Sequence, residues 1–241
     1  MYRITLLVTL ILLGSCSLKN RSDLESMNIN GKVRSINEKT FSINDSLEID
    51  KNYIFNESGQ VVSITHYYPT TQFNFKATNH YSFWGRLIEQ NFFESDSLDL
   101  KQVFIKIDNT KDSILAYDSK DDLVSSGILK YDENRNVIES LLYDTLKTVS
   151  YSETSLYDTN GKLAESEINS LDSSIDGDTY LFTYDSLGRV GSYSFRNKAG
   201  EYVQNEIYTY ESDQFGNWVE KTIVDANGDK IGIVKRELEY K

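Results

Sequence analysis

The sequence repeats a short motif in which glycine follows an aspartate by three residues, between segments that alternate polar and apolar side chains. YDTNGKL (157–163) and YDSLGRV (184–190) show the motif clearly, and DQFGNW (213–218) is a further copy. Aspartate at the first position of a type I turn accepts backbone N–H groups just ahead of it, and a left-handed glycine forms the bulge that closes a short hairpin. A phosphate-binding loop would need a helix after the glycine, whereas RVGSYSF is typical of a strand. The motif therefore predicts a hairpin turn.

These predicted turns recur at a regular spacing. The glycine positions of successive copies, at 135, 161, 188 and 216, lie 26, 27 and 28 residues apart, and a second series of turns falls between them. Asp121 and Arg135 occupy glycine positions, where a left-handed backbone costs about 1 kcal/mol, so we expect these two turns to be irregular. The predicted turn glycines are Gly59, Gly85, Gly161, Gly188, Gly200, Gly216 and Gly228.

Alternation with a period of two runs between the turns. In TYLFTYD, Tyr180, Phe182 and Tyr184 share one face, which is typical of a half-buried antiparallel strand. Each unit of about 26–28 residues then holds two strands, too few residues for a propeller blade of about 40–45. The sequence predicts an all-β fold: a long antiparallel meander of hairpin repeats with roughly fourteen to sixteen strands. A sheet this wide twists, so we expect it to be curved or partly closed, with the aromatic face on the concave side.

The first residues are typical of a targeting signal. Arg3 precedes an apolar run from Ile4 to Leu13, and this run is too short to span a bilayer of about 30 Å. Leu13-Gly14-Ser15-Cys16, which contains the only cysteine, resembles the lipobox of bacterial lipoproteins, in which the cysteine is lipidated. We therefore expect a lipoprotein signal peptide at 1–15, a tether at 16–27 and a β-repeat domain at 28–241. The alternative is an ordinary secretory signal with a chance cysteine.

Charge excludes one large class of partners. The chain has 25 basic and 37 acidic residues and a net charge of −12, and no basic stripe interrupts the acidic surface. Such a chain is repelled by phosphate backbones, so we expect no nucleic-acid binding.

No metal site, cofactor or catalytic group stands out. The two histidines, His66 and His80, flank a turn near Pro69, and pairing about that turn sets His66 opposite about residue 75, away from His80. DANGDKIG (225–232) departs from a calcium loop at its sixth and twelfth positions. We interpret it, and SLDSSIDGDTY (170–180), as turns. Paired carboxylates could perform glycosidase chemistry, but 37 acidic residues single out no pair.

The Tyr-Asp-x-x-Gly-Arg-Val stretch resembles the signature of YD repeats, also called RHS-type repeats. INGKVRSINEKTFS (29–42) and QFGNWVEKT (214–222) are similar to the opening and closing units of YD-repeat-like lipoproteins of Bacteroidota. The resemblance covers residues 28–241 and is strongest from 150 onward. Large members of the family form β-shells around a cargo, but this chain is much shorter and shows no toxin or autoprotease segment. The small lipoproteins imply no defined activity.

We therefore expect an exported lipoprotein, not an enzyme, whose β-repeat sheet is a binding or structural module of the cell envelope. It would contact the lipid bilayer through acylated Cys16, and its aromatic face could be the core or could hold a protein or glycan ligand. The alternatives are a carbohydrate-active or other hydrolytic enzyme, and an inhibitor or immunity-type partner. Ser17 is not the aspartate that retains lipoproteins at the inner membrane, and no acidic pair for surface export follows Cys16. This favours the outer membrane, facing the periplasm.

Overall fold

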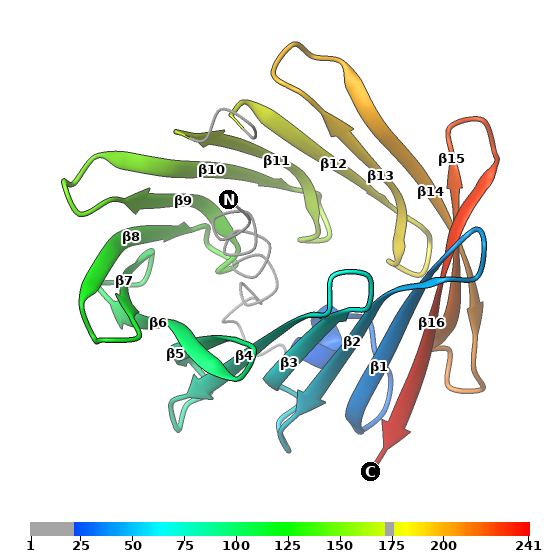
Figure 1. The fold of residues 1–241 in the computed structure, drawn as a ribbon, viewed down its shortest axis with the longest axis horizontal. Helices are drawn as coiled ribbons and strands as arrows, with labels where there is room; N and C mark the ends of the chain where they lie inside the picture. The colour runs from blue at the N-terminus through cyan, green and yellow to red at the C-terminus, as the bar shows by residue number, and fades with distance from the viewer. Residues whose placement is uncertain (1–21, 172–175) are drawn as a thin grey trace.

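The chain folds into a closed barrel of antiparallel strands (Figure 1). A computed structural model describes residues 22–171 and 176–241, and Cys16 lies outside the described residues. Within that part of the chain, a single turn of helix, α2 (Asp23–Ser26), precedes sixteen strands. The strands are β1 (Val33–Ser42), β2 (Leu47–Phe55), β3 (Val61–Tyr68), β4 (Phe73–Tyr81), β5 (Leu87–Glu94), β6 (Ser97–Lys106), β7 (Lys111–Asp118), β8 (Leu123–Tyr131), β9 (Val137–Tyr143), β10 (Val149–Tyr157), β11 (Leu163–Ser170), β12 (Asp178–Tyr184), β13 (Val190–Arg196), β14 (Tyr202–Ser212), β15 (Trp218–Asp225) and β16 (Lys230–Tyr240).

The meander is as predicted, but the prediction of a curved or partly closed sheet is wrong because the sheet closes completely. Each strand pairs with its neighbours in the sequence, and β1 pairs with β16 in an antiparallel register that sets Glu38 opposite Arg236 and Thr40 opposite Val234. An open sheet would leave two edges of unpaired N–H and C=O groups, and closure removes both. The repeat spacing indicates the number of strands but carries no signal for the contact between the first and the last.

The hairpin turns share one hydrogen-bond pattern. At Asp185, the N–H of Gly188 donates to the backbone carbonyl at 2.9 Å, while the N–H groups of Leu187 and Arg189 donate to carboxylate Oδ1 at 2.9 and 2.8 Å. Asp132, Asp158, Asp213 and Asp225 repeat this arrangement. The seven glycines named above have φ between 75° and 87°, in the left-handed region.

The expectation that the turns at Asp121 and Arg135 are irregular is wrong. Both residues adopt a left-handed backbone, with φ of 63° and 67°, and their N–H groups donate to Asp118 and Asp132 as in the glycine turns. The side chains of both residues make contacts of their own: Asp121 forms an ion pair with Lys101, and the guanidinium of Arg135 lies 4.0 Å from the centre of the Tyr131 ring.

Tyrosines at or near the end of a strand join neighbouring hairpins. The Tyr184 hydroxyl donates at 2.8 Å to the backbone carbonyl of Leu163. Leu163 is the first residue of β11, directly after the preceding turn at the same end of the barrel. Because the acceptor lies 20 or 21 residues earlier in the sequence, each bond links one two-strand unit to the next. The same bond recurs from Tyr81 to Val61, from Tyr157 to Val137 and from Tyr210 to Val190.

The inward-facing side chains of β1 to β11 form two apolar clusters. Ile36, Tyr53, Ile64, Ala77 and Phe92 are cross-strand neighbours in successive strands and make the centre of the first cluster. The second cluster gathers Phe104, Ile114, Leu129, Tyr131, Val137, Leu142, Tyr151 and Ile168. Burial of these side chains inside the barrel confirms that one face of the meander supplies the core.

One end of the barrel is crossed by residues 22–32, which we call the bridging segment. Ser22 caps α2 together with Glu25, and Leu24 is buried in the first cluster. The segment contacts three turns: the Leu24 N–H donates to Gly59 at 3.1 Å, the Asn28 side chain to Leu187 at 2.7 Å, and Asn30 exchanges hydrogen bonds with Asn217. Residues 22–27, placed in the tether by the sequence analysis, are therefore folded against what we call the α2 end of the barrel.

Gly188→Ala should destabilise the protein by about 1–2 kcal/mol more than Gly191→Ala. Gly188 has φ of 76°, and an added Cβ would lie 2.9 Å from Lys162 Cε, whereas a Cβ at Gly191 would meet its nearest neighbours at 3.5 Å. Urea unfolding of the two variants measures the difference. Equal stabilities would show that the turn geometry described here is wrong.

Candidate functional site: an aromatic cavity in the barrel

A cavity of about 1500 Å³ lies inside the barrel between the bridging segment and the strands from β10 onward. It is larger than the 300–1,000 Å³ typical of small-molecule sites. Eight aromatic residues contribute to its lining: Tyr53, Tyr157, Phe182, Tyr184, Tyr193, Tyr208, Tyr210 and Trp218.

Strand alternation explains why the rings meet here. Phe182 on β12 is the cross-strand neighbour of Tyr193 on β13, and their ring centres are 5.6 Å apart. Tyr210 on β14 and Trp218 on β15 are 5.7 Å apart. Every residue of β13 is half-buried, in contrast to β3 and β4, where inward residues are fully buried; Tyr193 of β13 lines the cavity.

Most of the tyrosine hydroxyls in this wall are already bound to the protein. Those of Tyr184 and Tyr210 donate to backbone carbonyls, and that of Tyr208 donates to Glu206 at 2.6 Å. Burial raises the pKa of Tyr184 and of Tyr210 to about 12, so both phenols are neutral at pH 7. These residues therefore contribute aromatic rings to the cavity wall and have little hydrogen-bonding capacity left for a ligand.

An ion pair lies at the floor of the cavity, at the junction of β1 and β16. Arg236 Nε donates to Glu38 Oε1 at 2.9 Å, and the guanidinium lies 3.4 Å from the centre of the Trp218 ring. The side chains of Arg236 and Glu38 are 5% and 13% exposed. This contact joins the closing strands, and removal of either charge would leave the other buried without its partner.

Lys221 on β15 also lines the cavity. Its Nζ lies 4.5 Å from the centre of the Tyr208 ring, and it makes no hydrogen bond or ion pair with any residue that the structure describes. Burial is the main cause that lowers its pKa below the usual range of lysine, and Lys51 and Arg236 contribute in the same direction. A lysine in an aromatic cavity is a candidate for binding an anion.

The two histidines lie on opposite faces of the sheet. His66 faces the barrel interior and pairs with Phe75, as predicted, while His80 is exposed and pairs with Glu89. Within the described ranges, no group of three histidine, cysteine or acidic residues is arranged to hold a metal ion. The Asp225 stretch forms a hairpin turn, since its carboxylate accepts the N–H groups of Asn227 and Asp229. Part of 170–180 lies outside the described residues.

Carboxylates that line the cavity already form hydrogen bonds or ion pairs with the protein. Asp158 and Asp185 accept backbone N–H groups within their own turns, which contributes to lowering the pKa of each, and Glu38 is paired with Arg236. A carboxyl with a raised pKa, Glu153, lies outside this lining; burial raises its pKa, and it accepts hydrogen bonds from Tyr151 and Ser166.

The sequence analysis singled out the aromatic face and the turn glycines but missed Glu38, Lys221 and Arg236. The sequence did contain an indication of these three residues, because each is a charged side chain at a position that strand alternation assigns to the apolar face. Lys221, for example, stands two residues before Ile223 and pairs with Val234. The position of Glu38 beside the other two was not predictable, because it depends on the closure of β1 against β16.

No known family model matches the chain, and no curated protein sequence matches it either. Solved structures show a distant similarity. A porin-like protein from Bacteroides uniformis is 12% identical, with a TM-score of 0.41 over 86% of this chain and 98% of that one. A porin-like protein from Bacteroides vulgatus is 10% identical, with a TM-score of 0.38 over 88% and 99%. A LolA superfamily protein from Nitrosomonas europaea is 8% identical, with a TM-score of 0.26 over 90% and 91%.

At this level of similarity the solved structures carry no argument about the function of this chain. The resemblance to YD repeats therefore rests on the sequence motifs alone. No described helix combines the length and apolar character needed to span a membrane.

Acidification should destabilise the barrel through His66. Burial, together with the nearby Lys51, lowers its pKa to about 4, below its usual 6.5, so the folded state favours the neutral ring. The unfolded chain takes up the proton first, and the stability that this residue contributes is lost as the pH falls from 6.5 towards 4. Between pH 7 and pH 5 the loss is about 2 kcal/mol.

Urea unfolding at both pH values tests this. His66→Phe should reduce the loss, while the matched variant at the exposed histidine, His80→Phe, should retain it. An unchanged pH dependence in His66→Phe would contradict the prediction.

Proposed function

We propose that this chain is an exported lipoprotein of a bacterial envelope whose barrel is a binding module, with the ligand held in the aromatic cavity. The observation that carries the proposal is the cavity itself. The half-buried rings in its wall leave apolar surface that no other side chain covers, and folded proteins otherwise minimise such surface. The lipobox-like segment around Cys16 supports anchoring to the membrane, and the residue after it favours the outer membrane, with the barrel in the periplasm.

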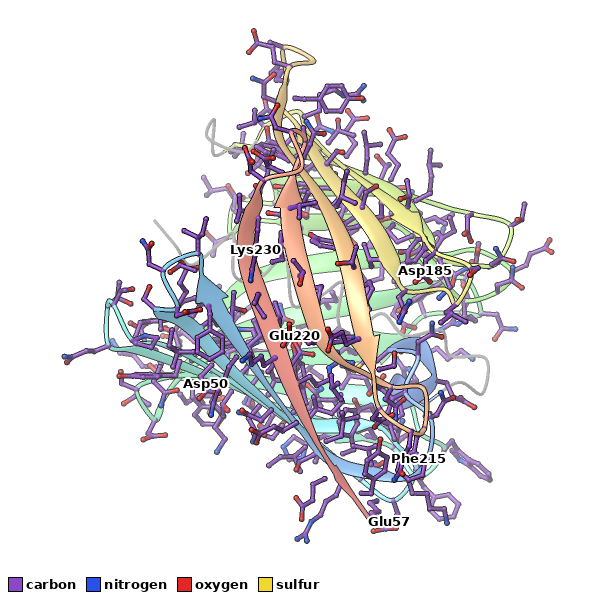
Figure 2. The ribbon with its side chains drawn as sticks, turned by 90° about the vertical axis from the view of Figure 1, so that its right-hand side faces the viewer. Asp50, Glu57, Asp185, Phe215, Glu220 and Lys230 are labelled. Atoms are coloured by element: carbon purple, nitrogen blue, oxygen red, sulfur yellow. The ribbon has the colours of Figure 1, made fainter. Side chains whose placement is uncertain are left out.

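The exterior of the barrel supports a location in water. Outward positions on β15 and β16 carry Glu220, Lys235, Glu237 and Glu239, and Figure 2 shows Glu220 on this side. A basic residue at the middle of a lipid-facing barrel surface costs about 2–4 kcal/mol. Attachment through a lipid on Cys16, rather than insertion of the barrel, is the arrangement that this surface favours.

The lowered pKa values and the hydrogen bonds of the carboxylates in the cavity wall favour a binding module over a hydrolytic enzyme. General acid catalysis needs a carboxyl with a raised pKa within reach of the substrate. In the cavity wall, Asp158 and Asp185 have lowered pKa values and Glu38 is committed to Arg236.

Occupancy of the cavity can be measured with Trp218, which lines it. The other tryptophan, Trp84, is 89% exposed at a turn, so Trp84→Phe leaves Trp218 as the only tryptophan. In this background the neutral apolar probe N-phenyl-1-naphthylamine should bind saturably and change the Trp218 emission. Removal of two cavity rings by Phe182→Ala with Tyr193→Ala should weaken binding at least fivefold.

Tyr202→Ala is the control for the loss of a ring, because Tyr202 is 58% exposed. It should leave binding of the probe unchanged. Absence of saturable binding, or equal loss in both variants, would overturn the proposal of a ligand cavity.

Cys16→Ala should release the protein from the membrane fraction. Each buried methylene of an acyl chain contributes about 0.8 kcal/mol, so only several chains together anchor firmly. Fractionation and palmitate labelling of the wild type, Cys16→Ala and Ser17→Ala measure the effect. A Cys16→Ala protein that stays in the membrane pellet would contradict lipid anchoring, whereas Ser17→Ala should remain anchored.

A further inference from the structure

We propose that the cavity binds an amphiphile with one anionic head group, and that Lys221 holds this group. The inference rests on the proposed function and names the chemistry of its ligand. Three observations carry it: the inward direction of Lys221, its lack of a hydrogen-bond or ion-pair partner among the described residues, and the aromatic side chains beside it.

The position of Lys221 follows from the alternation of β15. Glu220, labelled in Figure 2, pairs with Lys235 on the outer face, so its neighbour Lys221 points inward. Lys221 lies between Tyr210 on β14 and Val234 on β16 in the cross-strand register, beside the ring of Tyr208. Its ammonium group therefore stands in the cavity wall, among aromatic side chains.

The charges around Lys221 are mixed. Lys51 on β2 and Arg236 on β16 lower its pKa, whereas Glu38 on β1 and Glu206 on β14 raise it. The cavity lining holds four basic and four acidic side chains, and Lys221 is the one among them without a hydrogen bond or ion pair to a described residue.

Both carboxylates are committed elsewhere. Glu38 accepts from Arg236, and Glu206 accepts from the hydroxyl of Tyr208. Among the described residues, neither lies within ion-pair distance of Lys221, and an anion entering the cavity would supply the missing counter-charge.

Arg236 has a supporting role. Its Nη1 is buried without a hydrogen-bond partner among the described residues, but the guanidinium is fixed between Glu38 and Trp218. It adds positive potential, while Lys221 is the group free to reach a ligand. An ammonium binds carboxylate or phosphate as a point charge, so both head groups share the required chemistry.

The rings specify the rest of the ligand. Because the hydroxyls of Tyr184, Tyr208 and Tyr210 are engaged, these aromatic side chains have no free donor to offer a ligand. A sugar needs hydrogen bonds to its hydroxyls, whereas an alkyl chain needs apolar surface only. The combination of one unpaired ammonium group with aromatic side chains whose hydroxyls are engaged fits an amphiphile better than a glycan.

Competition against N-phenyl-1-naphthylamine tests the inference on the whole chain with Trp84→Phe. Dodecanoate should displace the probe at a concentration at least tenfold lower than dodecanol, which has the same chain and no charge. Lys221→Met should abolish this tenfold preference, with both competitors measured against the probe affinity of the same variant. Lys235→Met, which removes a lysine from the outer face, should retain the preference, and Lys221→Arg should restore most of it.

The outcomes separate this inference from the proposed function. If the probe does not bind, the ligand cavity itself is wrong. If the probe binds but dodecanoate and dodecanol compete equally, or Lys221→Met keeps the preference, the anion site is wrong and the cavity remains. Dodecyl phosphate in a parallel titration shows whether the site prefers a phosphate or a carboxylate head group.

Discussion

The pairing of β1 with β16 is the contact on which the rest of the structure depends. The two strands are almost two hundred residues apart in sequence, yet they form an antiparallel ladder from Ser42 to Val33, with a register shift between Ser35 and Val33. Without it, the meander would expose two edges and the interior would open to water. With it, Glu38 and Arg236 meet across the junction, and the rings of β12 to β15 face those of β2 across a shared interior.

Local structure could be predicted from the sequence because each hairpin is specified by residues close together in the chain. The carboxylate of Asp185 and the φ of Gly188 act within five residues, and the same pattern marks the turns at Asp158 and Asp213. The predicted pairing of His66 with position 75 succeeded for the same reason, since a single turn sets that register.

The errors have a common physical origin in contacts between distant segments. The side chain of Arg135, for example, donates a hydrogen bond to the carbonyl of Asn109, which belongs to a turn 26 residues earlier. Lys221 and Arg236 lie on the adjacent strands β15 and β16, but Glu38 joins them only because the barrel closes. A repeat signal describes each unit, but it contains no information on what faces that unit across the interior.

The adjacency of the first and last strands also makes the barrel circular in a topological sense. The N–H of Lys241 donates to the carbonyl of Lys32 at 2.9 Å, so β16 ends where the bridging segment leads into β1, at the α2 end. A permuted chain that joins these segments with a short linker and opens at the β9–β10 turn would keep every strand pair but begin at the opposite rim. The strand pairing is the same in both chains, so the barrel itself does not decide its orientation at a membrane. The rim at which the chain begins decides which rim a lipid anchor would hold against the bilayer, and the other rim would face an arriving ligand.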